Sequence, residues 1–196
     1  MTRKSWEIPP APLAGDATNT QTFAAVGNAL SSWEYFEAYL AMLYANLVGG
    51  NQNEGFAAMR SYGTIVSFQN RRKMLESAVE VHFAVYPDKE LQDKLADILT
   101  TAEKLSARRN EIAHGIVQPY APDLEPDVPS FALFPAYYAT NKRKLREQDL
   151  ALQLTTAQFV YSSAEIDKFA VAFSALVEPT LQVITAVLSR KRAPKR

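Results

Sequence analysis

The sequence contains no cysteine among its 196 residues. This absence excludes disulfides, thiolate metal sites and cysteine nucleophiles, and it suits a reducing compartment. Only two histidines are present, His82 and His114, and no carboxylates cluster near either in the sequence. We therefore expect neither a metal site nor a bound cofactor.

The sequence also has no excess of charge of either sign and no long hydrophobic run. Lys plus Arg and Asp plus Glu each number 21, so the net charge is zero. Any contact with nucleic acid must then come from a local patch. No stretch approaches the roughly 18 consecutive apolar residues of a membrane span, and the first fifteen residues lack the apolar centre of a signal peptide. The sequence thus predicts a cytoplasmic protein with no membrane contact.

Apolar residues recurring at spacings of three and four predict an all-α fold with four long helices, a four-helix-bundle core. We expect a flexible arm over residues 1–18, one helical domain over 19–190 and a basic tail over 191–196. The expected core positions are Phe23, Val26, Leu30, Trp33, Phe36, Leu40, Leu43 and Leu47; Met74, Leu75, Ala78, Val81 and Val85 after Val66; Leu91, Leu95, Ile98, Ala102 and Leu105; and Ile166, Phe169, Phe173, Leu176, Val177, Leu181, Ile184, Val187 and Leu188.

Local signals predict where these helices begin and end. The first is expected to start at Asn19 or Thr20 and to end before Gly49-Gly50. The second spans about residues 53–86 with a break near 61–64, and the third runs from a cap at Asp88 to a stop at Gly115. The last helix is expected to open with a Ser162-x-x-Glu165 capping box and to kink at Pro179.

Residues 116–162 have a different composition. Five prolines lie between Pro119 and Pro135, so no helix is expected to cross that stretch. Residues 130–138 and 150–161 are β-prone and are joined by a basic, polar segment. The sequence predicts a Pro-rich insertion with a β-hairpin between the third and fourth helices.

The candidate chemistry lies at the end of the third helix. Arg109 continues an apolar stripe, while Asn110 and His114 are four residues apart and share a face. Arginine binds phosphate with a planar fork, and histidine transfers protons near neutral pH. Attack by a ribose 2′-hydroxyl on its own phosphate needs such groups and requires no metal. One such histidine in each chain is short of an acid plus a base, so two chains meeting at a two-fold axis would supply both.

The Arg109–His114 segment resembles the R-x4-6-H motif of the HEPN superfamily, including the polar residue that often follows the arginine. HEPN proteins are helical bundles that generally dimerise, and many are metal-independent endoribonucleases of toxin–antitoxin and other defence systems. The resemblance implies that Arg109 and His114 form the catalytic pair of a composite dimer site and that Asn110 supports them. It also implies RNA as the substrate and an antitoxin or other protein as a partner.

Other interpretations of these residues remain open. Arg109 and His114 would be structural if the protein is a non-catalytic dimerisation or partner-binding module that has kept the motif. Binding of a nucleotide without cleavage is a third hypothesis. Arg71 and Arg72 are candidate phosphate contacts, although a solvated helix face explains such a basic run more simply. His82, which lies between Val81 and Phe83, is expected to be a packed core histidine.

Overall fold

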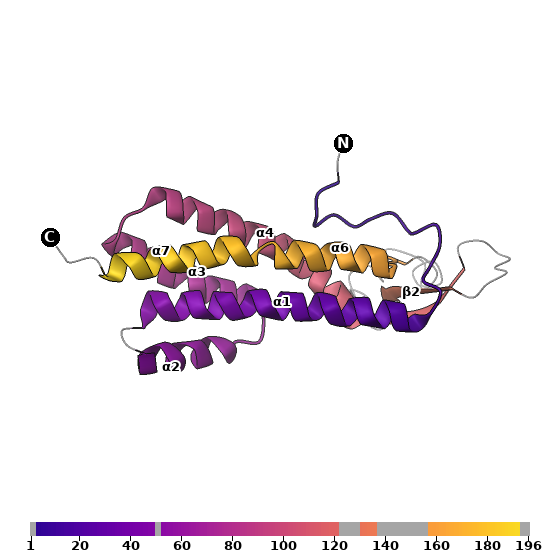
Figure 1. The fold of residues 1–196 in the computed structure, drawn as a ribbon, viewed down its shortest axis with the longest axis horizontal. Coiled ribbons are helices and arrows are strands. Elements are labelled where there is room, and N and C mark those ends of the chain that lie inside the picture. The colour runs from indigo at the N-terminus through magenta and orange to yellow at the C-terminus, as the bar shows by residue number, and fades with distance from the viewer. Residues whose placement is uncertain (1–2, 50–51, 122–129, 137–156, 193–196) are drawn as a thin grey trace, which may run out of the picture. The chain divides into compact units, whose positions relative to one another are not determined.

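The computed structural model describes residues 3–49, 52–121, 130–136 and 157–192. Within these residues the chain is mostly helical and carries one small two-stranded sheet, which confirms the broad all-α prediction. The helices are α1 (Asn19–Val48), α2 (Gln52–Gly63), α3 (Phe68–Val85), α4 (Lys89–His114), α6 (Ser163–Ser174) and α7 (Val177–Arg192), and the strands are β1 (Gly115–Tyr120) and β2 (Ser130–Pro135) (Figure 1).

The chain forms two compact units, each made from two separate stretches. Unit 1 comprises Met1–Ser31 and Ala107–Ala172, and unit 2 comprises Ser32–Ser106 and Phe173–Arg196. The candidate chemistry at the end of α4 therefore lies in unit 1, together with the N-terminal arm, the sheet and α6.

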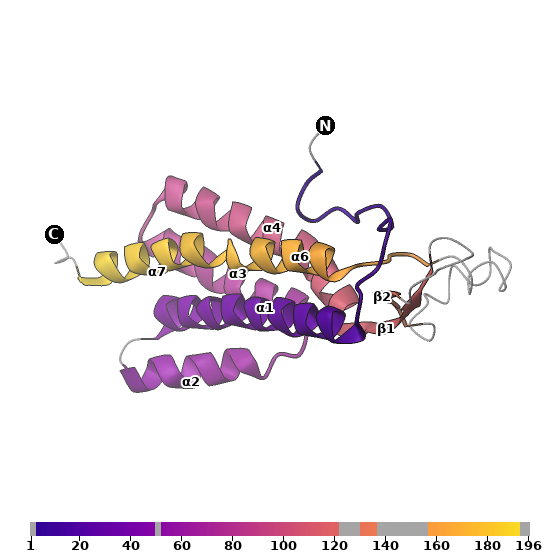
Figure 2. The same cartoon turned by 45° about the vertical axis from the view of Figure 1, so that its right-hand side comes forward.

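Unit 2 is held together by a helical core. Trp33 on α1 is 1% exposed, and its ring makes edge contacts with Phe36, Phe68 and Phe173. In both cartoon views α2 lies alongside the second half of α1 (Figures 1 and 2). Tyr62 at the end of α2 is buried and packs against Tyr44 of α1. The core predicted for the third long helix, which is α4 in the structure, is confirmed. All five of its expected apolar residues are buried: Leu91, Leu95, Ile98, Ala102 and Leu105.

The predicted core face of α1 is confirmed in its second half and wrong at its start. Phe23 is 56% exposed, whereas Thr22, Ala25 and Ala29 are buried there. Seven turns of about 3.6 residues counted back from Leu47 arrive at residue 22. The predicted core positions from Phe23 to Leu47 repeat at fewer than about 3.6 residues per turn. Towards the start of α1 they therefore move away from the buried side of the helix.

The core face expected for α3 is also partly wrong. Val81 and Val85 are exposed, as is Val66 just before the helix, while Val79, His82 and Phe83 are buried beside Leu75. His82 and Phe83 point into the core. Val81 and Val85 are four residues apart and share a different side of the helix, so both face solvent. The predicted break before α3 is confirmed, since Thr64 to Ser67 are not helical.

The helix caps are partly as predicted. Asp88 caps α4, where its Oδ1 accepts from the Leu91 N–H at 3.0 Å. Thr18 rather than Asn19 or Thr20 caps α1: its Oγ1 accepts from the Gln21 N–H at 3.4 Å, and the Gln21 side chain accepts from the Thr18 N–H at 3.1 Å. This reciprocal pair is a capping box.

The predicted kink at Pro179 is confirmed as a break between α6 and α7. Proline lacks an N–H and its ring crowds the carbonyl four residues earlier, which here belongs to Ala175. The helix tightens at that point, since the Leu176 N–H donates to the Phe173 carbonyl at 3.2 Å.

The sheet differs from the predicted hairpin. Strand β2 pairs antiparallel with β1, with Val117 opposite Leu133, so the strand that directly follows α4 is the partner. The other edge of β2 pairs with Asp16 through Phe131 and with Tyr161 through Leu133. Of the predicted strand over residues 150–161, residues 150–156 lie outside the described residues, as do Lys142–Arg146 of the basic segment.

Candidate functional site

Arg109 lies where the buried stripe of α4 meets the exposed side of the helix. Its neighbours on the stripe, Leu105 and Ile112, are each 1% exposed, whereas Arg109 itself is half-buried. One terminal nitrogen, Nη1, donates to Asn110 Oδ1 at 3.3 Å. Arg109 thus belongs to the core-facing side of α4, and its side chain extends to the exposed amide of Asn110.

Asn110 and His114 are both exposed and stand one helical turn apart, as their spacing predicted. The structure therefore brings Arg109 and Asn110 into direct contact and places His114 on the same exposed side as Asn110. His114 is the last residue of α4, immediately before β1. An amide and an imidazole that face outward from a helix end can be reached by a phosphodiester or by a second copy of the chain.

Gly115 sets how closely the sheet approaches this helix end. A Cβ atom at this position would lie 2.7 Å from the Leu133 side chain and 2.9 Å from the Glu111 carbonyl oxygen. Only glycine leaves room for β2 to pack there. Since Gly115 follows His114 directly, this close packing fixes the backbone at the candidate site.

A polar cluster beneath the motif was not predicted from the sequence. Tyr161 donates to Glu111 Oε2 at 2.5 Å, and Arg108 pairs with Glu111 Oε1 at 2.6 Å. The spacing of Arg108 and Glu111, three residues apart on one helix, was the available signal. Tyr161 gave no such signal, because only the sheet brings it close to α4. The cluster holds the last turn of α4 in place.

Burial raises the pKa of Glu111 above its ordinary value of 4.5, and the hydrogen bonds from Tyr161 and Arg108 offset only part of the rise. Burial also raises the pKa of Tyr161, and its bond to Glu111 adds to that effect. The protonated form of Glu111 is thus favoured by folding. Glu111 therefore contributes its full stabilisation below pH 4.5. This stabilisation is lost as the pH rises through the pKa that Glu111 has in the folded protein.

We therefore predict that Glu111→Gln flattens the dependence of unfolding free energy on pH just above 4.5. Glutamine keeps the size and an acceptor for Tyr161 but does not titrate. Denaturant unfolding between about pH 4 and about pH 7 measures the slope. Glu165 is the matched comparison: burial alone raises its pKa, but bonds from Lys168 and Arg3 bring it below 4.5. Glu165→Gln should accordingly change only the acid side, and an unchanged slope in Glu111→Gln contradicts the prediction.

Comparison with known proteins adds no relative. No family model, curated protein or solved structure matches this chain. The side chains at the end of α4 therefore carry the functional argument.

The two candidate phosphate contacts, Arg71 and Arg72, lie in unit 2 and are engaged with carboxylates. Arg71 pairs with the buried Glu37 at 2.9 Å, and its Nε donates to the Ile65 carbonyl at 2.7 Å. Arg72 pairs with Glu76 at 3.2 Å and also with Glu103. These contacts tie α1, α3 and α4 together and favour a structural role for both arginines.

His82 is 4% exposed and packs against the rings of Phe83 and Tyr86, which confirms the prediction of a core histidine. Among the described residues, no group of three His, Asp or Glu side chains gathers as metal ligands would.

Among the described residues, one stretch, Ser163–Arg190, which covers α6 and most of α7, is long and apolar enough to cross a membrane by length and composition alone. An 18-residue window within it has a mean hydropathy of 1.7. One-third of that window, 33%, is buried inside the protein, and core helices of soluble proteins pass the same test. It carries Glu165, Asp167 and Lys168 in its first two turns.

Proposed function

We propose that this protein is a metal-independent endoribonuclease of the HEPN type, acting at a composite site where two copies of a four-helix bundle meet. The observation that carries the proposal is the contact of the Arg109 guanidinium with Asn110 Oδ1 beside the exposed His114 at the end of α4. Asn110 and His114 are exposed and Arg109 is half-buried beside them, and this set can be completed by the same set from a second chain.

Each residue has a distinct role in this reaction. Arg109 binds the scissile phosphate and stabilises the charge that grows on its oxygens. Asn110 holds the guanidinium through its amide oxygen. One His114 accepts the proton of the ribose 2′-hydroxyl as that oxygen attacks phosphorus. The His114 of the second copy gives a proton to the departing 5′-oxygen as the P–O5′ bond breaks.

The proposal is tested with purified protein and mixed RNA in the presence of a chelator. We expect cleavage that leaves 2′,3′-cyclic phosphate and 5′-hydroxyl ends, because the 2′-oxygen is the nucleophile. End-group analysis separates this chemistry from contaminating metal-dependent nucleases, many of which leave 5′-phosphates. RNA that stays intact, or 5′-phosphate products, rejects the proposal.

A second candidate function is a helical module that binds a protein partner, such as an antitoxin, without cleaving RNA. The half-buried position of Arg109 against Leu105 and Ile112 favours it, because a stripe-end arginine also suits a helix–helix interface. This function is distinguished by wild-type protein that leaves RNA intact and by an Arg109→Ala variant that loses self-association in sedimentation.

A further inference from the structure

One side of α1 faces solvent along most of the helix. Exposed residues follow one another there at the spacings of three and four that mark a single side of a helix. Because α1 is one continuous helix, the positions of these residues relative to one another follow from helix geometry alone. We call them the α1 stripe: Thr20, Ala24, Gly27, Ser31, Tyr35, Ala38 and Met42.

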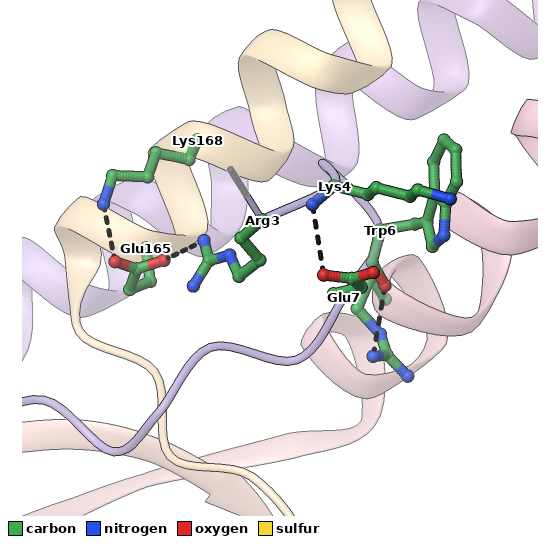
Figure 3. A network of polar contacts seen from close by, with 7 residues as sticks. Arg3, Lys4, Trp6, Glu7, Glu165 and Lys168 are labelled. Carbon is green, nitrogen blue, oxygen red and sulfur yellow. Dashed lines mark hydrogen bonds and ion pairs between the residues drawn. The ribbon is translucent and has the colours of Figure 1, made fainter. Parts of the chain in front are cut away.

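The charge pattern of α1 is unusual for a helix with a solvent-facing side. The structure describes all 30 of its residues, and none is lysine or arginine. Of its two glutamates Glu37 is buried, so Glu34 at the edge of the stripe is the only charged residue that this helix exposes. Exposed helix faces ordinarily carry charges. The start of α6 is of that kind, since Glu165 pairs with Arg3 at 2.8 Å and with Lys168 at 2.6 Å (Figure 3).

The stripe combines large apolar side chains with open positions. Tyr35 is 60% exposed and Met42 is 38% exposed. The Tyr35 ring is held in edge contact with the Tyr39 ring, with centroids 5.2 Å apart. Gly27 is exposed, and a Cβ atom there would meet nothing within 4 Å. A large side chain and an open position on the same face are the two parts of a knob-into-hole contact between helices.

The stripe reads the same in both directions from Ser31. The spacings are four, three and four residues towards either end of α1. In an antiparallel pair with Ser31 on the two-fold axis, residues at equal distances from Ser31 lie side by side across the contact. Tyr35 of one copy then packs beside Gly27 of the other, and Ala38 packs beside Ala24. A parallel pair would instead crowd Tyr35 against Tyr35 and leave Gly27 unfilled.

We propose that the α1 stripe is a self-association surface, on which a second copy of this chain docks its own α1 in antiparallel orientation with Ser31 at the two-fold axis. This goes beyond the RNA-directed function, because no residue of the stripe belongs to the motif on α4. If two copies also meet at the motif, the assembly is larger than a dimer, since the chain then has two different two-fold contacts.

The size of the stripe sets the strength of the contact. From Thr20 to Met42 it is about 33 Å long, at about 1.5 Å per residue, and it is one helix wide. Contacts this small belong to weak, transient complexes, so the pair should dissociate in the micromolar range of concentration.

The absence of cysteine makes a direct test available, since an introduced cysteine is the only one in the chain. With helix axes about 8–10 Å apart and Cα atoms about 2.3 Å from each axis, the two Ser31 positions come within reach of a disulfide. Under mild oxidation, Ser31→Cys should form a linked dimer at least roughly tenfold faster than Asp97→Cys, an exposed position on α4. Non-reducing electrophoresis measures both rates.

Two further positions test the register. Ala24→Cys and Ala38→Cys should each cross-link as slowly as Asp97→Cys, because equivalent positions of the two copies lie about 21 Å apart along the antiparallel helices. The double variant should cross-link about as fast as Ser31→Cys, since Ala24 of one copy lies beside Ala38 of the other. Fast cross-linking of either single variant indicates a parallel pair and overturns the proposal.

Gly27→Leu in the Ser31→Cys background tests the open position. In the free chain its Cβ meets nothing within 4 Å, and replacing a helical glycine favours the helix, so the variant should fold. In the pair leucine takes the space of Tyr35, so cross-linking should slow by roughly tenfold. Gly63→Leu is the matched control, because a Cβ at this exposed glycine also meets nothing within 4 Å.

Three results contradict the self-association surface: Ser31→Cys that cross-links no faster than Asp97→Cys, Gly27→Leu without effect, or an equal slowing by Gly63→Leu. RNA cleavage plays no part in these measurements, so their failure and the failure of the proposed nuclease are distinguishable.

Discussion

Replacing His114 with alanine is expected to slow RNA cleavage by roughly 10²–10⁴-fold, the contribution typical of a positioned acid–base group. The loss should fall on the chemical step, since His114 moves protons in the proposed reaction and does not hold the substrate. Because His114 is exposed at the last position of α4, its removal leaves the core intact. The helical circular dichroism signal and the melting temperature should therefore stay close to those of the wild type.

Matched variants make the result specific. Arg109→Ala should give a loss of similar size, whereas Arg60→Ala removes an exposed arginine from the end of α2 and should leave cleavage unchanged. Gln92→Ala is the corresponding control for His114, because it shortens an exposed side chain near the other end of α4. Full cleavage by both His114→Ala and Arg109→Ala removes these residues from the mechanism.

Replacing Asp16 with alanine is expected to cost about 3 kcal/mol or more of unfolding free energy. The carboxylate accepts from the Thr22 hydroxyl at 2.6 Å, and from the Ser163 N–H and hydroxyl at 2.9 Å and 2.6 Å. The Ser163 N–H opens α6, where a carboxylate also interacts well with the helix dipole. Alanine would leave the fully buried Thr22 hydroxyl without this acceptor.

Thermal unfolding measures the effect. A loss of this size corresponds to a fall in Tm of about 6–12 °C for a chain of this length. Asp16→Asn keeps one oxygen as an acceptor, so its Tm should lie between those of the wild type and Asp16→Ala. Asp97→Ala, which removes an exposed carboxylate on α4, should shift stability by no more than about 0.5 kcal/mol. Equal Tm values for Asp16→Ala and Asp97→Ala would show that Asp16 does not hold α1 and α6 together.

Local signals were sufficient for most helix boundaries. The apolar period, the glycines after Val48 and the proline at 179 placed α1 and the α6–α7 break, because each acts through its immediate neighbours. The face of a long helix was harder to predict. Small errors in period accumulate over 30 residues, which is how Phe23 was assigned to the core.

Features that depend on distant parts of the chain were missed. Neither the pairing of β1 with β2 nor the bond from Tyr161 to Glu111 has a local signal. The cap of α6 is a further example, since Asp16 lies 147 positions from Ser163 in the chain. For the candidate site, the sequence indicated that Asn110 and His114 share a face. It could not indicate that Arg108 also donates to the carbonyl of Trp6, which lies 102 positions away in the chain.

Strand β2 has a consequence for the order of events during synthesis. Its two edges are occupied by β1 on one side and by Asp16 and Tyr161 on the other. The partners of this one strand thus come from near the beginning of the chain and from its last quarter. On the ribosome, the amino-terminal turns of α1 have to wait for Tyr161 and Ser163 to emerge before unit 1 can close. Slow, late docking of this kind is the expected result of contacts between residues far apart in sequence.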